Sequence, residues 1–452
     1  MATWDKQILS QVKTLVSQGE VDQAAQLLQD MHPAEISHVL EMLPDDSKVL
    51  LFNALNAKTA AEVIVELSED SRQQVLDFLQ TEKLTEIVDD LPSDEATDII
   101  ADLPAEQASE VLRNIDAEDS AEVRTLLQYD EDTAGGIMQM EMVQARTDWT
   151  VSQVIDHIRL KGDEVENLVN IFVVDNQQRL AGVLPLAKLV TARPDAKAGE
   201  IMEPCDLVIR VDEDQEDVAH RFRRYDAISA PVVDEQGRLL GRITGDDVMK
   251  VLEEETSEDF LRMAGSSGDD IIYSGRILRV TGMRLPWLLT NLFGGMVTGW
   301  LLWLFRVRLT DAIFLISFIP VIMSMSGNVG IQSSTIMVRG FAVGRVSFAN
   351  LWSIVYRELR VALVMGLACG TVAGSVAYLW HGNATLGPVV GLSMLVAILA
   401  ASLIGTLAPA AFKKIKVDPA VSAGPFVTTF NDIMAITIYF TIATIFYHHL
   451  VV

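Results

Sequence analysis

Five long apolar stretches after residue 280 predict helices that cross a membrane. They cover residues 285–305, 312–338, 361–380, 387–412 and 419–447. About 20 apolar residues are enough to span the hydrocarbon core of a bilayer, so each stretch is long enough. Only the fifth contains a charged residue, Asp432, near its middle. The pattern therefore predicts an all-α transmembrane domain of five helices, with one unusual acid.

A different pattern occupies the first third of the chain. Residues 32–128 repeat loosely every 11 to 13 residues, and each unit opens on polar or acidic residues followed by apolar residues at helical spacing. Such a repeat predicts short helices stacked into a superhelix. Acids at helix starts are favoured by the helix dipole, so most of these carboxylates are explained as solvated surface.

An internal duplication follows, within alternating strand and helix patterns. The motif V-V-D-x-x-x-R-L-x-G occurs at 173–182 and again at 232–241, and matching segments precede both copies. The doubled motif resembles a tandem pair of CBS domains, α/β modules that sense ligands. The second copy also has the Gly-x-x-Thr-x-x-Asp turn of nucleotide-binding members, at Gly241, Thr244 and Asp247, whereas the first copy has Pro185 and Lys188. The sequence thus leaves open whether the protein binds ATP through Thr244 and Asp247.

The predicted fold class is a multidomain membrane protein. We expect an acidic, all-α superhelical N domain (1–135), first and second α/β CBS domains (136–199 and 200–245), an acidic connecting helix (246–275) and the transmembrane domain (276–452). The connecting helix has like charges at i, i+4 spacing, which destabilise an isolated helix. Its carboxylates are either a solvated charge run or a site for counter-ions.

Charge is strongly divided along the chain. Residues 271–452 contain four acids and twelve Lys or Arg, whereas the rest contains the other 58 of the 62 acids. An acidic soluble half argues against nucleic acid and for cations as partners. The N-terminus lacks the apolar core of a signal peptide, so we expect the soluble half in the cytoplasm. Most basic residues flank the spans on that side and only Arg306 and Arg308 lie on the other, which predicts an extracytoplasmic C-terminus.

The fifth and second spans hold the candidate residues for an ion path. A charge in a spanning helix is costly and usually faces a bundle interior or water. Pro425 would break the fifth span near Asp432, and polar or small residues interrupt the second span. Two alternatives stay open: Asp432 could be protonated or capped in a quiet helix contact, and the polar residues of the second span could serve helix packing. The candidate pore residues are Asp432, Asn328, Gly327, Gln332, Thr428, Asn431 and Pro425.

The order of these parts resembles the MgtE family of magnesium transporters over essentially the whole chain. The resemblance rests on LLQYDEDTAGGIM at 126–138, the doubled CBS motif, the acidic connecting helix, residues 320–332 and DPAVSAGPFVTTFND at 418–432. It implies a homodimer in the cell (inner) membrane that takes Mg²⁺ into the cytoplasm. Asp432 would be the pore carboxylate, and cytoplasmic Mg²⁺ would close the pore.

The resemblance also implies regulatory Mg²⁺ sites between the soluble domains. One departure is Lys250, where the connecting helix of the family often carries an acid. The matching acids are Asp94, Asp98, Asp214, Glu216, Asp226, Asp247, Glu255, Glu258, Asp259 and Asp418.

Two other classes of function remain as alternatives to a Mg²⁺ channel. One is a CBS-regulated secondary transporter that exchanges a divalent metal (Mg²⁺, Mn²⁺ or Co²⁺) against protons or sodium. The other is a membrane sensor that does not transport. No nucleophile, histidine-rich metal centre or phosphate loop stands out in the sequence, so an enzyme is not expected.

Overall fold

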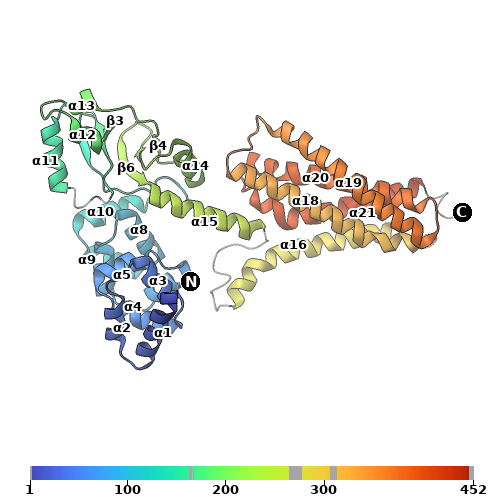
Figure 1. The fold of residues 1–452 in the computed structure, drawn as a ribbon, viewed down its shortest axis with the longest axis horizontal. Coiled ribbons are helices and arrows are strands. Elements are labelled where there is room, and N and C mark those ends of the chain that lie inside the picture. The colour runs from blue at the N-terminus through green and yellow to red at the C-terminus, as the bar shows by residue number, and fades with distance from the viewer. Residues whose placement is uncertain (1–2, 162–164, 166, 264–276, 306–312, 447–452) are drawn as a thin grey trace. The chain divides into compact units, whose positions relative to one another are not determined.

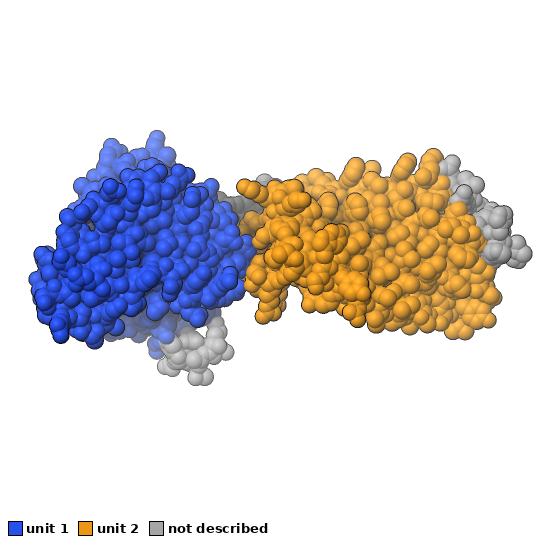
Figure 2. All heavy atoms as spheres, turned by 90° about the horizontal axis from the view of Figure 1, so that it is seen from above, with its two compact units in different colours: residues 1–253 blue, residues 254–452 orange. Residues whose placement is uncertain are grey.

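The computed structural model describes residues 3–161, 165, 167–263, 277–305 and 313–446 (Figure 1). Two compact units divide the chain, residues 1–253 and 254–452, and each is described below by itself (Figure 2). The expected connecting-helix residues 264–275 and the flanking Arg306 and Arg308 lie outside the described residues.

Ten short helices form the N-terminal part of the first unit. Residues that cap helix N-termini recur every twelve residues, at 32, 44, 56, 68, 80, 92, 104 and 116. Most of these helices contact the next but one along the chain, which gives a stacked superhelix. The helices are α1 (Thr3–Ser17), α2 (Val21–Leu28), α3 (Pro33–Glu41), α4 (Asp45–Ala54), α5 (Ala57–Ile64), α6 (Glu69–Leu76), α7 (Thr81–Asp89), α8 (Ser93–Asp102), α9 (Ala105–Asn114) and α10 (Ala117–Leu126).

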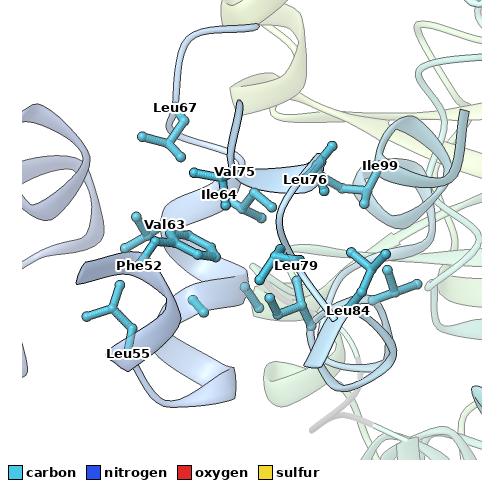
Figure 3. Close-up of a cluster of buried hydrophobic side chains, with 14 of the residues drawn as sticks. Phe52, Leu55, Val63, Ile64, Leu67, Val75, Leu76, Leu79, Leu84 and Ile99 are labelled. Carbon is cyan, nitrogen blue, oxygen red and sulfur yellow. The ribbon is translucent and has the colours of Figure 1, made fainter. Parts of the chain in front are cut away.

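One continuous apolar core runs through these helices. Phe52, Ile64 and Leu84 are among its fully buried side chains, and they come from three different helices (Figure 3). Helices of eight to ten residues are marginal alone in water, so burial of this shared core is what stabilises them. The predicted superhelix is confirmed.

The rest of the first unit contains two sheets of the same topology. The first is β1 (Gln144–Arg146), β2 (Asn170–Val174) and β3 (Leu180–Pro185), with helices α11 (Val151–Lys161) and α12 (Leu186–Thr191). The second is β4 (Ile209–Arg210), β5 (Ser229–Val233) and β6 (Leu239–Thr244), with α14 (Gln215–Tyr225). In each sheet the first pair is parallel and the second antiparallel. Both sheets carry a register shift at the same motif position, as a duplication requires.

The segments that lead into the two copies cross over between them. Gln139, before the first sheet, pairs with Arg242 of β6 in the second. Glu203, after α13 (Ala198–Ile201), pairs with Val183 of β3 in the first. Each core therefore contains residues from the other copy's leading segment, for example Met138 in the second. This crossing places Gln139 beside the residues that follow β6.

Within its described residues, the second unit contains five helices long and apolar enough to cross a membrane. It begins within α15 (Gly245–Met263), the helix expected to connect the two halves. The spans are carried by α16 (Ile277–Leu304), η3 (Ile313–Phe318) with α18 (Ile319–Ala342), α19 (Leu351–His381), α20 (Leu386–Lys414), and η4 (Ser422–Phe426) with α21 (Val427–Ile445).

The predicted third span began about ten residues late. Arg357, Glu358 and Arg360 interrupt the apolar pattern, but the helix starts at Leu351 and continues through them. Further along, Gly370 and Gly374 let α19 approach α20 closely, since an added Cβ at either would lie 2.6 Å from a carbonyl oxygen of α20. These glycines therefore serve close contact between two helices of one chain.

Candidate ion path and regulatory acids

The fifth span is broken just before the candidate pore residues. Gly424, inside η4, has non-helical angles (φ −88°, ψ −119°), and Pro425 follows it. The Gly424 carbonyl oxygen accepts from the N–H of Val427 and, at 3.2 Å, from the hydroxyl of Thr428. Irregular backbone at membrane depth is tolerated where it is buried in protein or lines a cavity.

Asp432 and Asn431 are neighbours in sequence but face different surroundings. Asp432 is partly exposed, and no hydrogen bond or ion pair joins it to another of the described residues. Asn431 is 1% exposed and points into the crossing of α18 and α21. A Cβ added at Gly330 of α18 would lie 1.8 Å from its Nδ2. The carboxylate thus faces outward from the bundle, whereas the amide fills the helix crossing.

The second span presents a polar stripe on its exposed side. Ser324, Asn328 and Gln332 are four residues apart and all exposed on α18. Because this spacing is about one helical turn, the three side chains share one face. Gly327 is buried and does not share that face. In a spanning helix, an exposed polar stripe suits water or a protein partner better than lipid.

The start of the fifth span is tied to the end of α15 within the second unit. Arg262 forms ion pairs with Asp418 and, one turn back on its own helix, with Glu258. The N–H of Ala420 donates to the Asp418 carboxylate at 2.7 Å. Asp418, one of the candidate regulatory acids, here contacts an arginine of α15.

Two of the predicted regulatory acids meet in the first unit. Asp94, at the start of α8, is 6% exposed, and Asp247, at the start of α15, is 9% exposed. The Nε2 of Gln139 donates to both carboxylates, at 3.3 and 3.1 Å. The other Asp94 oxygen has no hydrogen-bond partner among the described residues. Thr244 donates its hydroxyl and its N–H to Asp247.

The electrostatics of this pair are unfavourable in the absence of a cation. Burial and the nearby Asp247 carboxylate hold the pKa of Asp94 well above its usual range. Burial also raises the pKa of Asp247 to about 6. Two buried carboxylates form an arrangement that a divalent cation would stabilise, whereas the Gln139 oxygen already accepts a hydrogen bond from the Arg242 guanidinium at 3.1 Å.

Lys250 lies one turn along α15 from Asp247. It contacts α8, the helix on which Asp94 lies. Its ammonium group forms an ion pair with Glu95 at 2.7 Å. The residue that departs from the family pattern is therefore a cation paired with an acid of α8. The ammonium provides a positive charge that does not depend on bound metal.

The remaining regulatory candidates of the soluble half lie on α8, α14 and α15. Asp214 and Asp226 cap opposite ends of α14, about 18 Å apart at 1.5 Å per residue. Glu216 lies 3.6 Å from His220 on that helix. Among the described residues, no three or more His, Cys, Asp and Glu side chains gather as a metal site. Asp98 is exposed on α8, and Glu255 and Asp259 lie on the part of α15 that belongs to the second unit.

Sequence reasoning missed Gln139 and Arg262. Gln139 bridges Asp94 and Asp247 because its segment crosses to β6, and nothing in its local sequence indicates this. Arg262 had a signal: it is the only basic residue among the last acids of α15.

These features define a class: a polytopic membrane protein with an acidic soluble half, which contains a superhelix and two related α/β domains, and with polar groups on two spans. Family models described as "MgtE intracellular N domain", "CBS domain" and "Divalent cation transporter" match residues 31–132, 198–254 and 319–442. The magnesium transporter MgtE of Bacillus subtilis is 30% identical over 448 residues, 99% of either chain. That of Thermus thermophilus is 36% identical over 322 residues, 71% of either chain.

A solved structure agrees over the soluble half. The crystal structure of the cytosolic domain of the Mg²⁺ channel MgtE in complex with ATP is 33% identical, with a TM-score of 0.51. The match covers 54% of this chain and 99% of that chain. The chain belongs to the MgtE family of magnesium transporters. It is a membrane protein, and the family consists of transporters and not of enzymes.

Proposed function

We propose that the protein is a Mg²⁺ channel that admits Mg²⁺ to the cytoplasm down its electrochemical gradient. One observation carries the proposal: Asp432 is an outward-facing carboxylate on a spanning helix, and no other described residue pairs with it. An unpaired carboxylate facing lipid would be costly, so it needs a cation, water or a second subunit. The exposed stripe of Asn328 and Gln332 on α18 supplies further oxygen ligands.

This sparse set of oxygens suits Mg²⁺. The ion gives up its water reluctantly and usually keeps several waters while it contacts one or two carboxylates. We propose a homodimer in which the two Asp432 carboxylates face each other and bind hydrated Mg²⁺. Asn431 then has a different role from Asp432, because it is buried in the crossing with Gly330, where neither its Nδ2 nor its Oδ1 has a hydrogen-bond partner among the described residues.

The proposed orientation places the acidic half in the cytoplasm and the C-terminus outside. The excess of Lys and Arg on one side of the spans supports it. Cytoplasmic Mg²⁺ would then reach the buried Asp94 and Asp247 pair, where it would relieve the repulsion between them. Closure by Mg²⁺ requires that the ion bind the closed state more tightly than the open one.

Nucleotide binding remains an additional proposal with a specific constraint. The solved relative was crystallised with ATP. In this chain Thr244 and Asp247 are buried and hydrogen-bonded to each other. A ribose that used Asp247 would compete with that bond and with Gln139, so ATP and the Asp94–Asp247 interaction would be coupled.

The test is Mg²⁺ uptake into proteoliposomes with internal Mg²⁺ set low and then high. We expect wild type to conduct at low and close at high internal Mg²⁺, and Asp432→Ala and Asp432→Asn to lose uptake. Thr441→Val is the matched control, because Thr441 lies on the same helix and its hydroxyl only bonds Thr437. Normal uptake by Asp432→Asn would refute the carboxylate site.

The same vesicles distinguish a channel from an exchanger. A channel predicts uptake that follows the Mg²⁺ gradient and membrane potential, without dependence on a proton or sodium gradient. Uptake that reverses when either gradient is reversed would favour the secondary transporter.

A further inference from the structure

The last turn of α15 is fixed to the start of the fifth span by an arginine. Arg262 lies between two carboxylates, Asp418 before η4 and Glu258 one turn back on α15. The side chains of Arg262 and Asp418 are only 32% and 25% exposed, so the pair is partly screened from water. Asp418 is also held by the N–H of Ala420, which fixes its orientation.

Two apolar and backbone contacts lie next to this ion pair. Met263 packs against Val338 of α18 and Ala420. Its carbonyl oxygen approaches the break in the fifth span, where a Cβ on Gly424 would lie 2.8 Å from it. The end of α15 therefore contacts both helices that carry the candidate pore residues, at the point where the fifth span is irregular.

We propose that Arg262 is a resident cation that holds the end of α15 against the second and fifth spans without bound Mg²⁺. The inference rests on the proposed function and concerns its regulation. Bound Mg²⁺ would further stabilise a contact between α15 and the spans that the protein already makes without the ion. Asp418 then acts as the acceptor for Arg262 and not as a metal ligand. The closed state has a component that removal of Mg²⁺ cannot abolish.

The two roles of Asp418 predict opposite effects of the same substitution. If Arg262 holds the contact, Arg262→Gln destabilises the closed state, and more internal Mg²⁺ is needed to close the channel. If Asp418 is a metal ligand, Arg262 competes with Mg²⁺, and Arg262→Gln lowers the Mg²⁺ concentration needed. We expect the first result, with a rise of about three- to tenfold in the ratio of open to closed channels at low Mg²⁺, as for a partly exposed charge pair.

Uptake against internal Mg²⁺ should be measured for Arg262→Gln, Asp418→Asn and the double variant. Asparagine at 418 keeps an oxygen for the Ala420 N–H. The proposal expects each single variant to raise the closing concentration, and the double variant to match the singles because one interaction is removed in all three. Arg345→Gln, an exposed arginine in the loop after α18, controls for loss of one positive charge. Additive shifts, or a lowered closing concentration in Arg262→Gln, would overturn the proposal.

A second readout does not depend on Mg²⁺ gating. Met263→Cys with Val338→Cys, in a chain whose two native cysteines are replaced, should crosslink readily in EDTA. Adding Arg262→Gln should slow the reaction severalfold, and Arg262→Lys should restore part of it. Crosslinking that requires Mg²⁺, or that ignores Arg262, would refute the resident contact. If wild-type uptake proved insensitive to internal Mg²⁺, the proposed closure of the channel by Mg²⁺ would be refuted. The crosslinking experiment would still test whether Arg262 holds α15 against the spans.

Discussion

Replacing Asp247 by Asn should stabilise the soluble half of the protein at neutral pH when Mg²⁺ is absent. Asp247 is buried beside Asp94, and burial raises its pKa to about 6. At pH 7.5 the folded protein must hold this carboxylate ionised in unfavourable surroundings. Asparagine removes the charge and keeps an oxygen that can accept the hydrogen bond from Thr244.

The size of the effect follows from the difference between folded and unfolded pKa values. The unfolded value is near 3.8, and a rise of about two units corresponds to about 3 kcal/mol of destabilisation above pH 6. Because the pKa of this carboxyl is higher in the folded than in the unfolded state, the protein becomes more stable as the pH falls. The folded state binds the proton more tightly, so the penalty is complete above pH 6, fades as pH falls through 6 and vanishes below 3.8. Wild type should therefore gain about 1 to 2 kcal/mol between pH 7.5 and 5.

Urea denaturation of residues 1–263, followed by circular dichroism, measures this directly. A cytosolic domain of a relative was crystallised as a separate protein, which makes the fragment a reasonable choice. Asp247→Asn should be more stable than wild type at pH 7.5, with a smaller gain on acidification. It should also lose part of the stabilisation by Mg²⁺. The control is Asp195→Asn, the same change at an exposed loop position.

The reasoning fails if Asp247→Asn is no more stable than wild type at pH 7.5 in EDTA. It also fails if its pH dependence equals that of Asp195→Asn. Either result would mean that Asp247 is ionised without cost, for instance because water or Arg242 compensates the charge in solution. The Asp94–Asp247 pair would then lose its electrostatic reason to bind a cation.

Two further predictions concern other parts of the chain. Gly330→Ala should destabilise the membrane unit in detergent by about 1 to 3 kcal/mol, because the new methyl group would overlap Asn431. The control is Gly295→Ala: a Cβ at this position has nothing within 4 Å, so this variant should change stability by no more than about 0.5 kcal/mol. Cys205 should react with iodoacetamide at pH 8 about a hundredfold more slowly than a free thiol, since burial raises its pKa to about 11. Equal stability of the two glycine variants in thermal melts, or rapid labelling of Cys205 in a Cys369→Ser background, would contradict these predictions.

The elements of the fold could be predicted because each leaves a periodic signal. The spans are visible as apolar runs, and the superhelix as a repeat whose caps recur every twelve residues. The doubled motif at 173–182 and 232–241 predicted two related sheets. Where the pattern was interrupted by charges, as at Arg357 to Arg360, the helix start was misplaced. The apolar pattern of the sequence indicates which positions are buried, whereas a helix can continue into residues whose side chains are polar.

The polar contacts of the candidate sites could not be predicted in the same way. Asp94 and Asp247 are 153 residues apart in sequence, and they meet only because the segment of Gln139 crosses to β6. Likewise Asn431 and Asp432 are adjacent, and only the helix crossing at Gly330 shows that one faces inward and the other outward. A resemblance identifies which residues occupy a motif, but not the direction in which each side chain points.

The charges of α15 show why that difference matters for mechanism. From the sequence, the acids of this helix are either a solvated charge run or a site for counter-ions, and Mg²⁺ is one cation that could occupy such a site. The structure adds Lys250, paired with Glu95, and Arg262, paired with Asp418 and Glu258. Resident cations neutralise carboxylates at every Mg²⁺ concentration, whereas bound ions do so only when Mg²⁺ is abundant. We expect the response of this transporter to Mg²⁺ to depend on the buried pair of Asp94 and Asp247, whose charge Lys250 and Arg242 offset only in part.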